Sequence, residues 1–128
     1  MPHYNVALRN AQNDSITTAV GSAGKLQIYD GTQPAAGGTA TNKLAEFTLG
    51  TPFAPASASG VLSPTLPANT TGLFAGTATW FRITTSAAAW VIDGTAGTSG
   101  TELILNTAVI SVGLTVSTTG FTITAGNV

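Results

Sequence analysis

The chain has 128 residues, the length of one domain, and this is enough to bury an apolar core without disulfides or metals. It contains no cysteine, which excludes a disulfide framework and a thiolate metal site. Only 7% of the residues are charged and the formal net charge is -1, whereas about 25% is the usual charged fraction of a globular domain.

The low charge restricts the partners of the chain. Phosphate binding needs clustered Lys and Arg, and the chain has four of these in all, so we expect no nucleic acid partner. We expect no membrane span, because no apolar run approaches roughly 18 residues, and no secretory signal at the N-terminus. A surface of Thr, Ala and Gly is easily desolvated, which favours a subunit of an assembly.

Residues 5–20 are the one helix candidate. Asn5 is a suitable N-cap and Gly21 a suitable end. An imperfect apolar stripe predicts the face that packs on the body: Leu8, Ala11, Ile16, Ala19 and Val20. We expect residues 1–22 to form an arm that packs against a neighbouring subunit or clamps the open end of the domain.

From residue 25 the period changes to two, which predicts strands. Leu26 and Ile28 alternate with polar positions, and Asp30 with Gly31 indicates a turn. A long loop of small residues over 30–42 precedes a second strand at 44–49. Four prolines make residues 50–75 poor in strand, with at best an edge strand at 61–66.

Residues 76–94 hold both tryptophans and are the predicted centre of the domain. Trp80 and Arg82 alternate with Phe81 and Ile83, so both faces carry large groups, as in a central strand. A short loop then leads to Trp90, and the pair predicts an antiparallel hairpin whose second strand ends in a turn at 93–94. The predicted core contains Trp80, Phe81, Ile83, Trp90 and Ile92, with Phe47, Leu103 and Phe121 nearby.

The C-terminal part adds strand candidates at 102–106, 108–112, 114–118 and 120–124, the last two joined by a turn at Thr119 and Gly120. About eight short strands with frequent turns predict a mainly β protein, an antiparallel β-sandwich of jelly-roll type with one short N-terminal helix. Residues 23–128 form the single sandwich domain in this prediction.

The residues available for chemistry are few. Asp30 and Asp93 precede glycines and are predicted to cap local backbone N–H groups. Arg82 shares a face with Trp80, which predicts stacking on the indole or an ion pair across the sheet. Solvent or subunit contacts are assigned to His3, Glu46 and Glu102, and Asp14 is given no role. We therefore predict no catalytic, cofactor-binding or metal-binding residues, no cofactor and no enzymatic activity.

Three segments carry a resemblance to a known group of proteins: residues 7–12 (ALRNAQ), residues 26–34 (LQIYDGTQP), and residues 78–83 (ATWFRI) followed by 91–94 (VIDG). In this order they resemble small virion proteins of tailed bacteriophages, of the capsid decoration or cement type. The resemblance implies a β-rich homo-oligomer, a trimer or dimer, that binds the major capsid protein at the surface of the virion and stabilises the shell.

Two other functions remain open. A tail or head-tail connector component would have the same composition, because it is also a symmetric assembly of small β subunits. A tail-fibre carbohydrate-binding module would need exposed aromatics, and the candidates are Tyr4, Tyr29, Trp80 and Trp90. Both tryptophans are predicted to lie in the core, which disfavours the carbohydrate-binding function.

Overall fold

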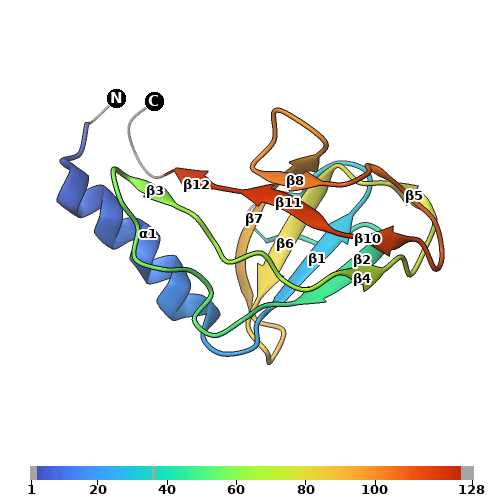
Figure 1. Cartoon of the computed structure of the whole chain (residues 1–128), viewed down its shortest axis with the longest axis horizontal. Helices are drawn as coiled ribbons and strands as arrows, with labels where there is room; N and C mark the ends of the chain where they lie inside the picture. Colours follow the sequence, from blue (N-terminus) through green and yellow to red (C-terminus); the bar gives the residue numbers. More distant parts are fainter. Residues whose placement is uncertain (1–2, 36, 125–128) are drawn as a thin grey trace.

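The computed structural model describes residues 3–35 and 37–124 and is shown in Figure 1. The chain is mainly β, with 36% strand and 12% helix, as the sequence predicted. Helix α1 (Val6–Val20) comes first, and a curled sheet forms the body. The sequence predicted an arm over residues 1–22 and a domain over residues 23–128. The first two residues of this arm and the last four of this domain lie outside the described residues.

The ends of α1 follow the predicted capping chemistry. The Asn5 side chain accepts a hydrogen bond from the Leu8 N–H at 2.8 Å and so satisfies one of the free donors of the first turn. Gly21 ends the helix with φ 69°, and its N–H bonds the Thr17 carbonyl. The prediction of this helix is confirmed within one residue at its start.

The predicted apolar stripe of α1 is confirmed at Ile16 and Val20, which pack on the core, and is wrong in the rest of the helix. Leu8, Ala11 and Ala19 are exposed, and Asn13 and Val20 are the buried residues of the helix. The reason lies in the surface beneath α1, which presents the backbone N–H and C=O groups of Ser57 and Gly60. Polar side chains are therefore needed on the inner face of the helix.

Six strands form the curled sheet in the order β11-β8-β7-β6-β1-β2. Their bounds are β1 (Lys25–Tyr29), β2 (Lys43–Thr48), β6 (Trp80–Thr84), β7 (Trp90–Gly97), β8 (Leu103–Leu105) and β11 (Thr118–Phe121). Strand β6 lies inside the sheet between β1 and β7, which confirms the predicted central strand. The predicted β6–β7 hairpin is also confirmed, with a loop over residues 85–89.

The sheet is mixed, so the prediction of a purely antiparallel sheet is wrong. Strands β7 and β8 pair in parallel through Ala96 with Leu103 and Gly97 with Ile104. Parallel neighbours usually need a long crossover. Here the pairing is two residues long, and the connecting loop is closed by the Glu102 carboxylate, which accepts a hydrogen bond from the Thr95 N–H at 3.1 Å.

The turn predicted at Asp93 and Gly94 is absent, because β7 continues through both residues to Gly97. Gly94 is required for a different reason. A Cβ atom at this position would lie 2.6 Å from Cε1 and Cζ of Phe81, so only glycine leaves room for the Phe81 ring. The glycine marks a close approach of a side chain to the backbone and not a reversal of the chain.

Three short strand pairs complete the body: β3 (Val61–Leu62) with β12 (Ile123–Thr124), β4 (Thr70–Thr71) with β10 (Thr115–Val116), and β5 (Gly76–Thr77) with β9 (Val109–Ile110). The C-terminal run β10–β11–β12 crosses the body in one direction and pairs in turn with β4, β8 and β3 (Figure 1). The turn predicted at Thr119 and Gly120 is therefore wrong. Gly120 lies inside β11 at a shift of register.

The apolar core lies inside the curl of the sheet. It contains most of the predicted residues: Phe47, Phe81, Ile83, Leu103 and Phe121, with Ile92 partly buried against them. Phe121 packs edge-on against Phe81 and Phe53, with ring centroids 5.1 and 6.1 Å apart. Trp80 is buried as predicted, but it lies outside this cluster.

The prediction that Trp90 belongs to the core is wrong, because 49% of this residue is exposed. Trp90 lies at the loop end of the hairpin, where it pairs with Thr84. Its indole packs on the backbone of Gly37, where an added Cβ would lie 2.6 Å from Trp90 Cδ2. The two tryptophans therefore have different environments, one buried and one at the surface.

Candidate functional site

The segments around β4, β5 and β10 lie at one end of the molecule (Figure 1), and they carry five exposed large apolar residues. We call this set of five residues the apolar end: Leu73, Phe74, Val109, Val112 and Leu114. Val112 is 72% exposed and Phe74 is 61% exposed. An exposed group of this kind is typical of a surface that another molecule covers.

Backbone hydrogen bonds hold the two loops of the apolar end together. The Gly72 N–H bonds the Leu114 carbonyl at 2.8 Å, and the Gly113 N–H bonds the Gly72 carbonyl at 3.0 Å. An added Cβ at Gly72 would collide with the Ser111 carbonyl oxygen, so this close contact requires glycine. The Leu73 N–H bonds the Leu44 carbonyl at 2.7 Å, which ties the apolar end to β2.

The two segments that form the apolar end contain no charged residues. Residues 70–77 and 107–117, the two segments that build it, contain no Asp, Glu, Lys or Arg. Covering this surface would therefore remove apolar groups and a few hydroxyls from water, but no ions. The desolvation cost is small, and each 100 Å² of covered apolar area contributes about 2.5 kcal/mol before the entropic cost of association is subtracted.

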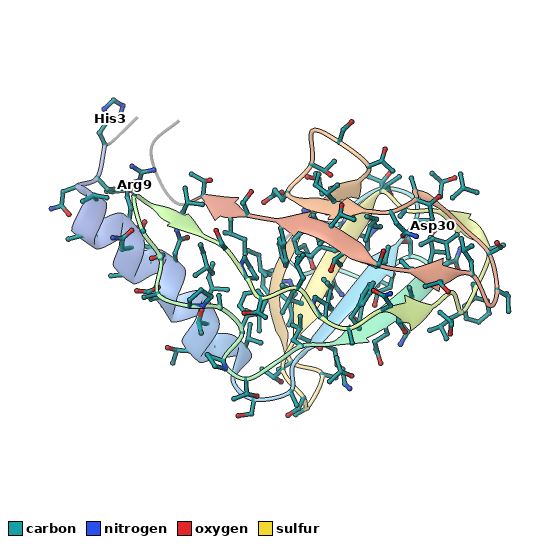
Figure 2. All side chains as sticks on the ribbon, in the orientation of Figure 1. His3, Arg9 and Asp30 are labelled. Carbon is teal, nitrogen blue, oxygen red and sulfur yellow. The ribbon has the colours of Figure 1, made fainter. Side chains whose placement is uncertain are left out.

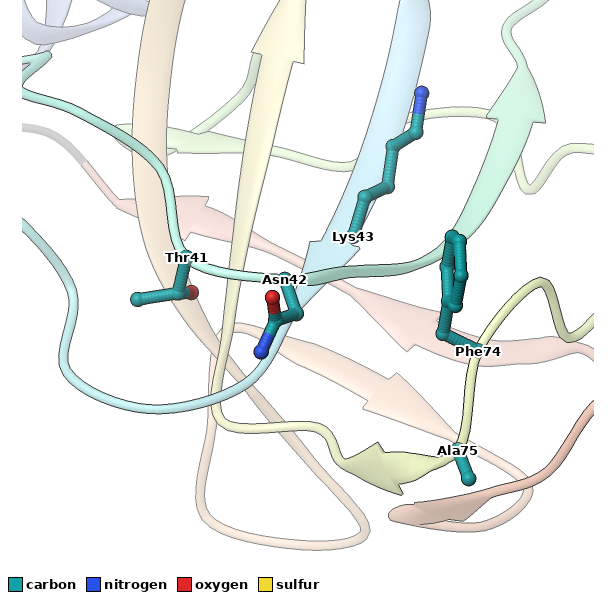
Figure 3. A pocket seen from close by; sticks show the side chains of 5 residues that line it. All are labelled: Thr41, Asn42, Lys43, Phe74 and Ala75. Carbon is teal, nitrogen blue, oxygen red and sulfur yellow. The ribbon is translucent and has the colours of Figure 1, made fainter.

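A pocket of about 340 Å³ adjoins the apolar end. Its lining comes from two segments: Thr41, Asn42 and Lys43 at the start of β2, and Phe74 and Ala75 before β5 (Figure 3). The Lys43 ammonium lies 3.1 Å from Glu46 Oε2. Burial raises the pKa of Glu46, but hydrogen bonds from Gln27 and Lys43 outweigh this and lower the pKa overall.

Asp30 fixes the segment on one side of this pocket. Its carboxylate accepts hydrogen bonds from the Asn42 N–H at 3.1 Å and from Asn42 Nδ2 at 3.3 Å, and these bonds lower the pKa of Asp30. The predicted role in capping is confirmed for a backbone N–H, but the partner is twelve residues away. Figure 2 shows Asp30 near the apolar end, and His3 and Arg9 at the α1 end.

On the face of the sheet opposite the core, Arg82 makes both of the predicted contacts. Its guanidinium carbon lies 5.2 Å from the Trp80 ring centre, and Nε lies 2.8 Å from Asp93 Oδ1. The hydrogen bond to Asp93 raises the pKa of Arg82. Asp93 was predicted to cap a turn, which is wrong, because its carboxylate pairs with Arg82 across the β6–β7 hairpin.

The described residues between β1 and β2, 30–35 and 37–42, cover this cluster, and we call them the outer loop. Arg82 Nη2 donates to the Gly38 carbonyl at 2.8 Å, and Trp80 Nε1 donates to the Asp30 carbonyl at 2.9 Å. Tyr29 stacks on Trp80 with ring centroids 4.5 Å apart, and burial raises the pKa of the Tyr29 phenol. The cluster is filled by its own contacts and is structural.

The other predicted residues are spread over the molecule. His3 is exposed, Asp14 bonds the Ser57 N–H, and Glu102 bonds Thr95. Within residues 3–35 and 37–124, no three His, Asp or Glu side chains lie close enough together to hold a metal ion. No helix in the described part of the chain is long and apolar enough to cross a membrane.

The apolar end was not among the features predicted from the sequence. A signal was present, because Val109, Val112 and Leu114 are large apolar residues in a stretch without charges. A period-two pattern does not separate Val112 and Leu114 from buried Ile110 and Val116, because they stand an even number of positions from both. Comparison with protein-family models, with curated proteins and with solved structures finds no match.

Proposed function

We propose that this chain is a structural subunit of a tailed-bacteriophage virion, a decoration or cement protein that binds the assembled capsid and stabilises it. The observation that supports this best is the apolar end, a group of exposed apolar side chains on loops without charges. Such a surface is suited to permanent cover by a protein partner, here the major capsid protein. The resemblance of the sequence to decoration proteins supports the same function.

The proposal includes the assembly and the finer architecture. The subunit acts as a homo-oligomer, a dimer or trimer, so that several apolar ends bind at once and weak contacts sum to tight attachment. Its location is the outer surface of the capsid. The jelly-roll-like sandwich also belongs to the proposal, with the short pairs β10–β4 and β12–β3, joined through the edge strand β11 of the curled sheet, as the second layer.

The proposal is tested with phage particles from which the gene for this chain has been deleted. Purified protein is added, and bound protein is measured after sedimentation. Val112→Glu places a charge in the apolar end and should reduce binding at least about tenfold, because an ion would be buried without a partner. Val6→Glu is the matched control, since Val6 is 51% exposed on α1 and should leave binding unchanged.

Copy number separates a decoration protein from the tail or connector alternative. Hundreds of copies over the shell, and particles that lose heat resistance without the protein, are expected for a decoration subunit. A ring of six or twelve copies at one vertex, or a few copies along the tail, would overturn the decoration function in favour of the alternative.

A carbohydrate-binding module is the second candidate, and two observations favour it. Trp90 is half-exposed, and the exposed ring of Phe74 borders a pocket with the amide of Asn42. An aromatic ring beside an amide is the chemistry that binds a sugar. Tyr29, the earlier candidate for this role, is 6% exposed and stacked on Trp80, so it is unsuited.

A glycan array tests this second function. Reproducible binding that Phe74→Ala abolishes and Leu73→Ala preserves would support the pocket as a sugar site, because Leu73 is its exposed neighbour outside the pocket lining. The capsid and carbohydrate functions are distinguished by Val112→Glu, which should weaken capsid binding but leave sugar binding unchanged. An array without hits would reject the carbohydrate function.

A further inference from the structure

Helix α1 makes several hydrogen bonds to one segment of the body. We call residues 57–60 the helix seat. Asn13 Nδ2 donates to the Gly60 carbonyl at 2.8 Å, and Asn10 Oδ1 accepts from the Gly60 N–H at 2.9 Å. Asp14 Oδ1 accepts from the Ser57 N–H at 2.8 Å. An α1 helix from a second copy of the chain could make the same hydrogen bonds to the helix seat.

The apolar part of the same contact is small. Val20 is buried and Ile16 is partly buried against the core, both in the second half of α1. Two further buried atoms, Asn13 Oδ1 and Thr17 Oγ1, have no hydrogen-bond partner within the described residues. The attachment is therefore weaker than that of a helix packed through a continuous apolar face.

The connection from α1 to β1 is short and strained. It consists of residues 21–24, in which Gly21 has φ 69° and Ala23 has φ 53°. The left-handed region is unfavourable for alanine, so the turn that brings α1 back onto its own body has a cost that an extended connection would not have. Gly24 is also enclosed, because an added Cβ would lie 2.8 Å from the Thr84 carbonyl oxygen.

A short hinge under strain and a transferable set of contacts are the conditions under which copies of a chain exchange an element. We infer that α1 is an exchangeable arm, which in the assembled protein binds the helix seat of a second copy of this chain. The exchange keeps the hydrogen bonds of Asn10, Asn13 and Asp14 and releases the strain at Ala23. It is favoured where copies are concentrated, as in an assembly.

Two opposite substitutions at one exposed hinge position test this inference. Ala23→Gly removes the strain and should lower the oligomeric fraction by about fivefold, whereas Ala23→Val increases the strain and should raise it. The fraction is measured by size-exclusion chromatography with light scattering on the purified full chain. Equal masses for wild type and both variants at every concentration would overturn the exchange.

A disulfide cross-link shows which copy supplies the helix. The chain has no cysteine, so the pair Asp14→Cys and Ser57→Cys gives a cross-link without background. After oxidation, denaturing non-reducing gels should show covalent dimers or larger species for exchanged helices. A cross-linked monomer alone would overturn the inference, and if no cross-link forms, the masses of the Ala23 variants decide. These tests use the purified chain without phage particles, so they fail or succeed independently of the capsid function.

Discussion

At the scale of single residues, Arg82 and Asp93 form a largely buried ion pair on the outer face of the sheet. The two side chains are 11% and 5% exposed, and Arg82 makes two hydrogen bonds to the carboxylate. A buried ion pair adds little to the free energy of folding compared with apolar residues of the same size. Removal of one partner, however, leaves an uncompensated charge in the interior. The pair therefore fixes the conformation of the hairpin and of the outer loop above it.

Arg82→Met should lower the free energy of unfolding by about 3 kcal/mol, because the Asp93 carboxylate would stay buried without its partner. Urea unfolding measures this loss. The double variant Arg82→Met with Asp93→Leu should lose less than Arg82→Met alone, since no charge then remains buried. Equal losses in the single and double variants would show that the ion pair is not the cause.

Gly94 provides a second test at this scale. Gly94→Ala should lower the free energy of unfolding by about 1–3 kcal/mol, because the new Cβ would overlap the Phe81 ring. Gly50→Ala is the matched control, because the nearest atom to its added Cβ is the Pro52 carbonyl oxygen at 3.9 Å, an ordinary contact. Thermal unfolding of both variants gives the comparison, and a Gly94→Ala protein as stable as Gly50→Ala would contradict the close approach.

At the scale of elements, the outer loop illustrates how a segment without helix or strand is held in one conformation. It is bonded at its base by Trp80 and Asp30, in its middle by Arg82, and it packs against Trp90 through Gly37. These contacts with Trp80, Arg82 and Trp90 join the loop to residues at least 44 positions away in the chain, whereas the bond between Asp30 and Asn42 lies within the loop itself. The loop is therefore stable only when the sheet beneath it is formed.

Asp30 makes the stability of the outer loop depend on pH. The hydrogen bond from the Asn42 N–H lowers the pKa of Asp30 in the folded protein below the ordinary value of 3.8. The contribution of Asp30 to the free energy of folding is therefore full above the ordinary pKa and is lost as the pH falls through the lower pKa of the folded state. Wild type should therefore be more stable than Asp30→Asn at neutral pH. Urea unfolding should show this difference shrinking below about pH 4. A difference that stays constant down to about pH 2 would exclude the Asp30 carboxylate as its cause.

At the scale of the whole molecule, few charges are available for contacts with a partner. The charged fraction of 7% and the uncharged segments of the apolar end predict that attachment depends on apolar contact and little on ion pairs. Binding of the protein to phage particles should change less than about twofold between about 0.05 M and 0.5 M NaCl. Sedimentation at each salt concentration measures this. A strong loss of binding at high salt would indicate an electrostatic interface instead.

The sequence by itself determined the features that depend on neighbouring residues. Asn5 and Gly21 fixed the ends of α1, because capping involves hydrogen bonds over three or four positions. Two-fold alternation located β1 and β6 and the hairpin that follows. Stacking of Arg82 on Trp80 was also predictable, since Trp80 is two residues away on the same face, and an acid across the sheet was predicted as a partner without being identified as Asp93.

Only the tertiary structure decided the features that depend on distant residues. Trp90 is large and apolar, as core residues usually are. It is half-exposed because it lies at the loop end of the hairpin, where the backbone of Gly37 packs against it. The inner face of α1 is polar because the helix seat, more than forty residues away in sequence, offers backbone groups. The apolar end arises because hydrogen bonds from Gly72 bring two separate loops together. Burial depends on which segments are in contact in the folded chain, and the local sequence pattern does not determine these long-range contacts.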